Sequence, residues 1–265
     1  MPGEHNSGMS SDPVSSREQF NAQASQYAAS AVHRHGPSLP VLLDYAAPLP
    51  QDRALDVATG TGNTAHALAP FVASVVGLDL ADLMLDHARR RAQEDRQTNV
   101  RFVVGSAETI PFPDAAFTLV TSRHAPHHFL NLDRFLAEAH RVLEPGGRLV
   151  VADQISPTPA VQAWMDPYQT LRDPSHHAQR TVEAWRALAE AAGFVWTQDT
   201  LVPYRLDFAW WTAQSGCTPE TVQRLRAHAD ALGEAERQAA GLEYDAGGLL
   251  VAHIEQMLVV RLEKR

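Results

Sequence analysis

The sequence is poor in cysteine, in long apolar runs and in positive charge, and each shortage excludes a class of protein. Cys217 is the only cysteine in 265 residues, so neither an internal disulfide nor a zinc site built from cysteines can form. No stretch approaches the roughly 20 apolar residues of a membrane-spanning helix. With 22 Lys and Arg against 31 Asp and Glu, the formal net charge of −9 disfavours nucleic-acid binding, which depends on basic contacts to phosphates. The composition favours a cytoplasmic protein with a small-molecule partner and no membrane partner, and it leaves a homodimer open.

The chain is expected to consist of a short tail and one domain. Residues 1–16 are rich in Ser, Pro and Gly and lack the basic start and apolar stretch of a secretory signal, so we expect a disordered tail. Residues 17–265 contain enough apolar side chains for one sizeable α/β domain. No internal repeat and no second domain is recognisable.

From about Leu43 onward, short β-like runs alternate with helical patterns, which is typical of a parallel sheet with helices on both faces. Strands are expected at residues 53–57, 74–79, 100–104, 117–122 and 148–153, with a later antiparallel pair near 196–206 and 254–262. The pattern therefore predicts a mostly parallel, seven-stranded sheet.

The helix between the fourth and fifth strands has the clearest pattern. Its apolar residues recur at spacings of three, four and seven, as on one face of an α-helix. They are Leu132, Phe135, Leu136, Ala139, Val142 and Leu143. Pro145-Gly146-Gly147 is expected to end this helix, because proline cannot continue it and glycine permits the turn. A further helix is expected over 182–192.

Two stretches, about 157–180 and about 207–247, are too long for simple connections between elements. Helical insertions of this size over the carboxyl ends of strands commonly form lids, so we expect these two to build a pocket. Trp210 and Trp211 could close over an apolar ligand there, although large aromatic side chains more often only pack.

The most informative segment is residues 54–65, Ala-Leu-Asp-Val-Ala-Thr-Gly-Thr-Gly-Asn-Thr-Ala. Gly60 and Gly62 stand where a strand becomes a helix, and glycine lets the backbone approach a ligand closely there. The following helix N-terminus attracts negative charge. Alone, the Gly-x-Gly-x-x-Ala pattern suits NAD and FAD proteins equally well.

Three further features favour a nucleoside ligand that carries an ammonium group. Asp56 ends the first strand, where a carboxylate would repel a pyrophosphate but suits an ammonium group. Asp79 ends the second strand and could accept hydrogen bonds from two ribose hydroxyls. Residues 105–108, followed by the acidic turn 110–114, end the third strand where an adenine would lie. The alternative, ordinary turn residues of an α/β sheet, is weak when all these signals occur in order.

Together these motifs resemble those of the class I S-adenosylmethionine-dependent methyltransferases, specifically the ubiquinone/menaquinone-biosynthesis C-methyltransferases (UbiE-like). The matching motifs span about residues 50–155: Leu55-Asp-Val-Ala-Thr-Gly-Thr-Gly62, Val76-Gly-Leu-Asp79, Gly105-Ser-Ala-Glu-Thr-Ile-Pro-Phe112 and Arg141-Val-Leu-Glu-Pro-Gly-Gly147. The resemblance implies a Rossmann-like methyltransferase fold with S-adenosylmethionine as the cofactor. The sequence departs from the family at Ser106, where an aspartate is common, and at Ala58, where many relatives have a first glycine.

The resemblance also implies roles for individual residues. The Gly60–Gly62 backbone would face the methionine part of the cofactor, Asp79 would hold the ribose, and Ser106 or Glu108 would meet the adenine amine. Tyr27, in an expected N-terminal helix with Phe20, could cover the cofactor. The full set of expected cofactor-binding residues is Tyr27, Asp56, Ala58, Thr59, Gly60, Gly62, Asp79, Leu80, Met84, Ser106, Ala107, Glu108 and Arg123.

The candidates for the methyl-acceptor site follow the fourth strand, in residues 122–129 (Ser-Arg-His-Ala-Pro-His-His-Phe). His128, or His127, could take a proton from the acceptor, and the rate would then fall below about pH 6.5, the ordinary histidine pKa. Arg123 could hold an acidic substrate or the cofactor carboxylate. Alternatively, the histidines cap the next helix or pack in the core.

A second cluster, residues 172–177 (Arg-Asp-Pro-Ser-His-His), lies in the first insertion. Arg172 and His176 are expected to point into the acceptor pocket; otherwise Asp173-Pro174 is a turn with Arg172 salt-bridged across it. No metal site is expected, because His124 and His128 have i, i+4 spacing but lack a His-Glu-x-x-His pattern and a third ligand.

The sequence therefore predicts an S-adenosylmethionine-dependent methyltransferase with a small-molecule carbon or oxygen acceptor. Cofactor motifs report binding and not chemistry, so a non-methylating reaction such as decarboxylation or cyclisation stays open. Asp56 and the order of the motifs argue against a dinucleotide-dependent oxidoreductase. The two His/Arg clusters argue against a non-catalytic nucleoside-binding regulator.

Overall fold

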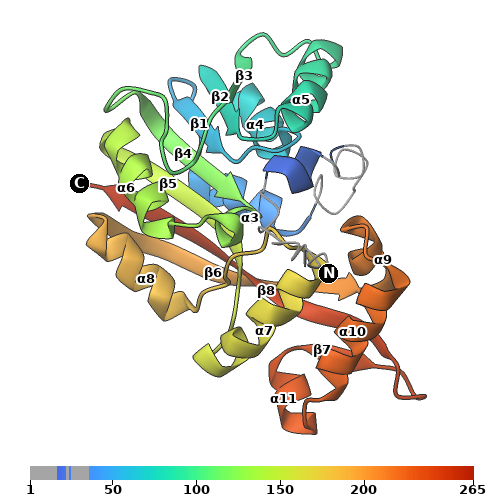
Figure 1. The fold of residues 1–265 in the computed structure, drawn as a ribbon. Coiled ribbons are helices and arrows are strands. Elements are labelled where there is room, and N and C mark those ends of the chain that lie inside the picture. The colour runs from blue at the N-terminus through green and yellow to red at the C-terminus, as the bar shows by residue number, and fades with distance from the viewer. Residues whose placement is uncertain (1–16, 22–23, 25–35) are drawn as a thin grey trace, which may run out of the picture.

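The computed structural model describes residues 17–21, 24 and 36–265, and it contains one mixed sheet. Within residues 36–265, eight strands pair in the order β3-β2-β1-β4-β5-β8-β6, with β7 paired to β8 (Figure 1). The strands are β1 (Arg53–Val57), β2 (Ser74–Asp79), β3 (Val100–Val104), β4 (Phe117–Arg123), β5 (Leu143–Ile155), β6 (Phe194–Asp207), β7 (Leu242–Tyr244) and β8 (Leu250–Lys264). β1 to β5 are parallel, whereas β6 and β7 pair antiparallel with β8. The Rossmann-like fold is confirmed. The expected tail 1–16 and Tyr27 lie outside the described residues.

Helices cover both faces of this sheet. They are α3 (Ser38–Ala46), α4 (Asn63–Leu68), α5 (Asp82–Glu94), α6 (Leu132–Val142), α7 (Pro159–Arg172), α8 (Val182–Ala191), α9 (Phe208–Gln214), α10 (Pro219–Asp230) and α11 (Glu234–Ala239), with short 3₁₀ turns η1 (Ala69–Phe71) and η2 (Pro126–His128). Threonine side chains accept a backbone N–H at the starts of α7, α8 and α10, and a proline follows the threonine in α7 and α10. Among the described residues, no helix combines the length and apolar character needed to cross a membrane.

Alternating residues of the central strands pack into two hydrophobic cores, one on each face of the sheet. In β1, Ala54 packs in the core that contains α3 and α4, whereas Leu55 and Val57 pack in the core that contains α6 and α8. Figure 1 shows α6 and α8 together on one side, with α7 and α9–α11 gathered at one end of the sheet beside β7. The expected apolar stripe of α6 is buried against this second core, from Leu132 to Val142.

The entry to β5 and the number of strands differ from the sequence-based expectation. Helix α6 ends at Val142, before the proline, because Leu143 already pairs with Phe117 as the start of β5. Pro145-Gly146-Gly147 therefore forms an irregular entry to a strand, where the pairing register shifts between Phe117 and Leu119. The expected seven-stranded sheet is also wrong by one strand, since the three-residue β7 inside the second insertion pairs with β8. Three residues carry too little alternation to reveal a strand.

Candidate functional site

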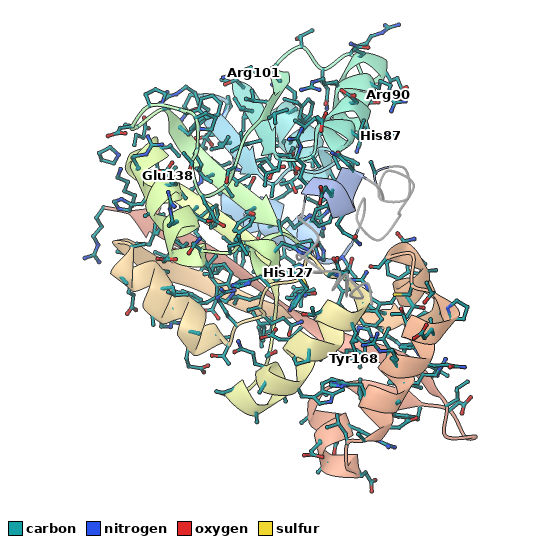
Figure 2. The ribbon with its side chains drawn as sticks, viewed as in Figure 1. His87, Arg90, Arg101, His127, Glu138 and Tyr168 are labelled. Atoms are coloured by element: carbon teal, nitrogen blue, oxygen red, sulfur yellow. The ribbon has the colours of Figure 1, made fainter. Side chains whose placement is uncertain are left out.

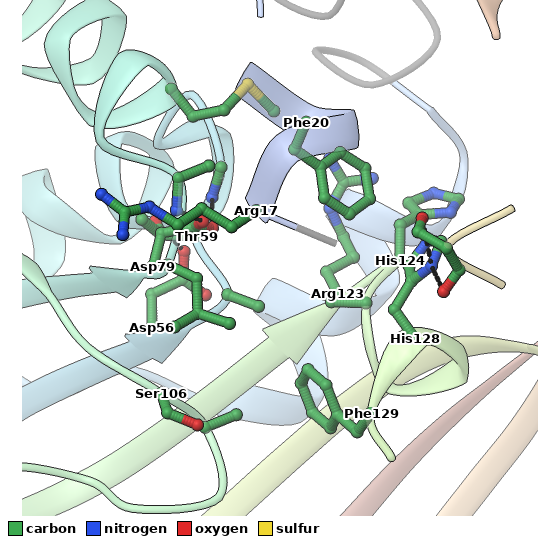
Figure 3. Close-up of a pocket in the computed structure, with 18 of the residues that line it drawn as sticks. Arg17, Phe20, Asp56, Thr59, Asp79, Ser106, Arg123, His124, His128 and Phe129 are labelled. Atoms are coloured by element: carbon green, nitrogen blue, oxygen red, sulfur yellow. Dashed lines mark hydrogen bonds between the residues drawn. The ribbon is translucent and has the colours of Figure 1, made fainter. Parts of the chain in front are cut away.

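The carboxyl ends of β1, β2 and β4 open into a cavity of about 640 Å³. Its size is typical of ligand pockets, and it lies where the strand order reverses between β1 and β4, the usual site for ligands in open α/β sheets. Figure 3 shows two groups of side chains on opposite sides of this cavity. The glycine-turn end contains Asp56, Ala58, Thr59, Gly60, Asp79, Leu80 and Met84, and the histidine end contains Arg123, His124, His128, Ser175, His176 and His177.

Asp79 connects the end of β2 to the glycine turn. Its Oδ2 accepts the N–H of Gly60 (2.7 Å) and its Oδ1 accepts the N–H of Ala81 (2.8 Å). Burial raises the pKa of Asp79, and these backbone donors oppose the rise. An ionised carboxylate has about four acceptor positions, so roughly two remain for a ligand.

Gly60 and Gly62 both have left-handed backbones, with φ of +55° and +80°, but they serve different surfaces. Gly60 lines the cavity, and an added Cβ would make only an ordinary contact, 3.4 Å, with the Met84 methyl. Gly62 does not line the cavity, so its expected role in cofactor binding stays a prediction. A Cβ on Gly62 would lie 2.9 Å from His66 Nε2 and 3.0 Å from Ala88 Cβ, so glycine is required for packing α4 against α5.

Asp56 forms the floor of the cavity and is only 1% exposed. The hydroxyls of Thr59 (2.5 Å) and Thr121 (2.7 Å) each donate to one of its oxygens. Burial raises the pKa of Asp56 to about 6, against the opposing effects of these hydroxyls and of Arg123.

Ser106, Ala107 and Glu108 line the cavity beside the glycine-turn end. Both carboxylate oxygens of Glu108 accept from Asn131, through its backbone N–H (3.1 Å) and its side-chain amide (2.8 Å), so this carboxylate secures the start of α6. The Ser106 hydroxyl accepts the Glu108 N–H (3.1 Å) and keeps its own proton to donate.

The acidic turn 110–114 does not line the cavity, which corrects the expectation that it meets an adenine. Glu138 of α6 accepts the N–H of Ile110 (2.7 Å), and Arg141 donates to the Phe112 carbonyl (2.8 Å) and to Asp114 (2.9 Å). Figure 2 shows Glu138 on α6, well away from the centrally placed His127. The turn is therefore fixed to α6 and serves the fold.

Arg123 ends β4 and projects into the cavity (Figure 3). Its guanidinium donates to the hydroxyls of Thr64 and Ser38, at 3.4 Å each, and burial lowers its pKa. His124 follows with a left-handed backbone (φ +54°), and its Nε2 lies 3.5 Å from the same Ser38 hydroxyl. The sequence pointed to His124 only as a weak metal candidate. Among the described residues, no three His, Cys, Asp or Glu side chains gather in a metal-binding arrangement.

His128 lies in η2, with its ring on the cavity wall. Its Nδ1 is 3.0 Å from the Ser175 carbonyl oxygen and 3.2 Å from the Ser175 hydroxyl. The Phe20 ring meets it edge-on at 4.9 Å, and the His127 ring lies at 4.1 Å. Burial and the neighbouring His127 lower the pKa of His128, so its ring is neutral at pH 7.

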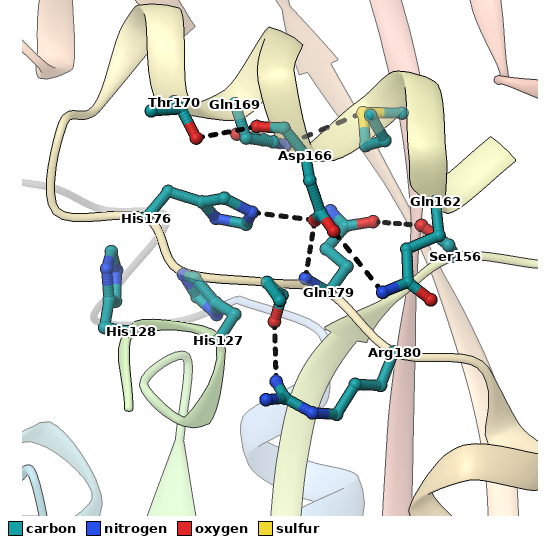
Figure 4. A network of polar contacts seen from close by, with 12 residues as sticks. His127, His128, Ser156, Gln162, Asp166, Gln169, Thr170, His176, Gln179 and Arg180 are labelled. Carbon is teal, nitrogen blue, oxygen red and sulfur yellow. Dashed lines mark hydrogen bonds and ion pairs between the residues drawn. The ribbon is translucent and has the colours of Figure 1, made fainter. Parts of the chain in front are cut away.

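His127 is buried behind His128 and does not line the cavity, so the structure does not bring it to the expected acceptor site. Its Nδ1 lies 2.6 Å from Asp153 Oδ1. Burial lowers the pKa of His127 to about 3 and raises that of Asp153 to about 8, and both shifts favour the uncharged forms of the pair. The His127 carbonyl accepts the N–H groups of His177 and Ala178, which joins η2 to the segment after α7 (Figure 4).

The expected pair Arg172 and His176 is divided between two places. His176 lines the cavity, and its Nε2 lies 3.0 Å from Asp166 Oδ1 (Figure 4). Arg172 turns away: its guanidinium lies over the Trp211 ring at 4.7 Å and its Nε donates to the Trp211 carbonyl. The structure therefore does not bring Arg172 to the expected acceptor site, and Trp211 packs in a core beside the ring of Tyr168.

Several residues line the cavity that the sequence did not single out as binding residues. Arg17, Thr61, Asn63, Thr64, Ala81, Gly105, Ala125, Phe129, Leu130, Pro174, Ser175 and His177 complete its walls. Most of them adjoin the recognised motifs, and this adjacency could have identified them. Phe20, which belongs to the N-terminal helix expected to cover the cofactor, also lines the cavity and packs against Ala24, Ala81 and Met84.

Comparison with known proteins places these features in a family. A "Methyltransferase domain" family model matches residues 55–151. The YcgJ protein of Bacillus subtilis, an uncharacterized methyltransferase, is 27% identical over 247 residues, which cover 93% of this chain and 98% of that protein. Its crystal structure superposes with a TM-score of 0.84 over 87% of this chain and 99% of that chain.

Two further relatives match less of this chain. The uncharacterized protein YafE of Escherichia coli is 32% identical over 69% of this chain and 89% of its own length. The demethylmenaquinone methyltransferase of Renibacterium salmoninarum is 30% identical over 64% of this chain and 71% of its own.

Proposed function

Since the chain belongs to the class I S-adenosylmethionine-dependent methyltransferases of the UbiE-like type, we propose that it methylates a carbon or oxygen atom of a small molecule bound at the histidine end of the cavity. The observation that carries this proposal is the continuity of the cavity. Gly60 and Asp79 line the same space as Arg123 and His128. A donor held at one end can therefore present its methyl group to an acceptor at the other.

The glycine-turn end fits S-adenosylmethionine on its own chemistry. Asp79 retains acceptor positions for ribose hydroxyls, and Gly60 exposes its backbone to the cavity without a side chain. Asp56 offers a carboxylate near the expected ammonium group, while Leu80 and Met84 offer apolar surface beside the nucleoside. Ser106, free to donate its proton, can meet the base. The cofactor supplies a methyl group on a sulfonium, so the reactivity arrives with the ligand.

The protein's own contribution is to align the acceptor, exclude water and accept one proton. Alignment alone can supply several kcal/mol of a displacement barrier. Arg123 is placed to orient an oxygen of the acceptor, and His128, neutral at pH 7, to accept its proton. Phe20 and Phe129 provide apolar walls that keep water away.

A cytoplasmic location and a homodimer also belong to this proposal. The single cysteine is compatible with a reducing compartment. Light scattering of the purified protein would test the homodimer, and fractionation of the cells that make it would test the location.

The acceptor can be identified with a labelled donor. The purified protein is incubated with methyl-labelled S-adenosylmethionine and a metabolite extract, and label is followed into low-mass and macromolecular fractions. The proposal expects label in a low-mass compound, and none with the Asp79→Ala protein. Label found only in protein or nucleic acid would contradict it.

A further inference from the structure

The two ring nitrogens of His128 must play different roles in the proposed acceptor site, so its tautomer matters. A neutral imidazole carries one proton, and the nitrogen that takes the acceptor's proton must be the one without it. Resting on the proposed function, this requirement makes Nε2 the bare nitrogen, because Nδ1 is already occupied by Ser175.

Ser175 offers Nδ1 two oxygens and no proton. Its carbonyl oxygen, 3.0 Å away, can only accept. Its hydroxyl lies 3.2 Å from Nδ1 and 2.6 Å from Asp173 Oδ1. Since a carboxylate can only accept, the hydroxyl proton points to Asp173, and a lone pair of the hydroxyl faces His128.

Burial and hydrogen bonds fix Asp173 in the position that orients the Ser175 hydroxyl. It is 2% exposed, and its Oδ1 accepts the Ser175 N–H (2.9 Å) as well as the hydroxyl. Its own N–H donates to the Gln169 carbonyl (2.8 Å), which anchors it to the end of α7. Burial alone would raise the pKa of Asp173, but the hydrogen bonds from Ser175 and the nearby positive charge of Arg172 lower it.

The His128 ring is also held on its other sides. The His127 ring lies at 4.1 Å, and the Phe20 ring meets it at an interplanar angle of 89°. The ring therefore cannot readily turn over to exchange its two nitrogens.

We propose that Asp173 and Ser175 are positioning residues that fix His128 in its Nδ1–H tautomer and so direct an unprotonated Nε2 into the cavity. Asp173 acts through the hydroxyl of Ser175 and touches no substrate. The segment after α7 thus determines which nitrogen of His128 in η2 is protonated, although Asp173 lies 45 positions after His128 in sequence. The sequence suggested only a turn at Asp173-Pro174.

The test is the nitrogen NMR spectrum of the protein with labelled histidine, recorded with S-adenosylhomocysteine and without any acceptor. The His128 signals are those lost in His128→Gln. We expect a protonated Nδ1 and an unprotonated Nε2 in the wild type and in Ser175→Thr, which keeps the hydroxyl. In Ser175→Ala the two nitrogen shifts should move toward each other as tautomers mix, and in Asp173→Ala, which releases both oxygens of Ser175, they should move further.

Thr170→Ala is the matched control, because it removes an α7 hydroxyl that donates only to the Asp166 carbonyl. It should leave the His128 shifts unchanged. A protonated Nε2 in the wild type, or shifts that are the same in all five proteins, would overturn the proposal. If Asp173→Ala does not fold, Ser175→Ala against Ser175→Thr decides alone. Because no acceptor is present, this experiment tests the tautomer of His128 alone. A different tautomer would leave methyl transfer unrefuted, and a failure of methyl transfer would leave the tautomer unrefuted.

Discussion

At the scale of single residues, the site combines side chains that hold the protein together with side chains that remain available to ligands. Asp79 accepts two backbone N–H groups and still has lone pairs to offer. Glu108 also accepts two hydrogen bonds, both from Asn131, at the start of α6. Two carboxylates on the same cavity wall therefore support different elements, the glycine turn and α6, which residue type alone does not reveal.

Asp79→Ala should weaken S-adenosylmethionine binding by about 2–4 kcal/mol, roughly 30- to 1,000-fold, because hydrogen bonds to a charged acceptor contribute about 1.5–3 kcal/mol each. Titration calorimetry measures the change. Asp86→Ala is the control, since Asp86 lies on α5 in an exposed pair with Arg89 and should leave the affinity unchanged. Equal affinity for the wild type and Asp79→Ala would show that the nucleoside lies elsewhere.

His128→Ala should lower kcat by about 10²–10⁴-fold with the identified acceptor, while cofactor affinity stays within a few-fold. The pH profile should differ from that of an ordinary histidine. Because the pKa of His128 is lowered, its neutral form persists as the pH falls, and the rate should stay flat through pH 6.5. Loss of half the wild-type rate near pH 6.5 would mean that the ring titrates as a solvent-exposed histidine does.

At the scale of elements, the sequence predicts what short-range periodicity and turn chemistry determine. The strands β1 to β3 and the stripe of α6 are as expected, because alternation and helical spacing are local. The start of β5 was missed because it depends on pairing with β4, and β7 was missed because three residues carry too little alternation to reveal a strand. The sequence likewise places both glycines in the β1–α4 turn, but only the fold determines that Gly60 faces the cavity and Gly62 packs against α5.

Replacing each glycine with alanine should separate binding from folding. Both variants carry the cost of a left-handed alanine, about 1–3 kcal/mol, but only Gly62→Ala also meets His66 and Ala88 at 3.0 Å or less. Gly62→Ala should therefore lower Tm more than Gly60→Ala, whereas Gly60→Ala should weaken cofactor binding more. Thermal melts and calorimetry on the two proteins check both statements, and the opposite order of Tm values would refute this division of roles.

Arg148 of β5 forms a buried ion pair and also joins the end of α3 to the sheet, so its replacement tests the stability of this part of the fold. Arg148 donates to Asp52 (2.6 Å) and to the Ala47 carbonyl (3.0 Å), and it is 7% exposed. Arg148→Met should lower the free energy of unfolding by about 3–5 kcal/mol, because it leaves Asp52 buried without its partner.

The control is Arg53→Met, which breaks the exposed pair with Glu144 and should cost at most about 1 kcal/mol. Denaturant unfolding of both variants measures the difference. Similar losses in the two proteins would contradict the importance of burial at Arg148.

At the scale of the whole molecule, the cavity is assembled from segments of very different sequence separation. The glycine-turn end comes from motifs within residues 56–84, so it could be predicted almost completely. The histidine end combines β4 and η2 with the segment after α7, and only some of its residues could be predicted from the sequence. His176 reaches the cavity while Arg172 stacks on Trp211, a choice that depends on the position of α9. No local pattern encodes such a packing relation between insertions.

Counting two products in the same reaction shows most directly whether the protein transfers a methyl group. With the identified acceptor, S-adenosylhomocysteine and the methylated compound are quantified together by mass spectrometry during the first turnovers. We expect one S-adenosylhomocysteine for every methyl group transferred, and neither product from Asp79→Ala. Conversion of the acceptor without S-adenosylhomocysteine would contradict the account, because the bound cofactor would then assist a reaction that transfers no methyl group.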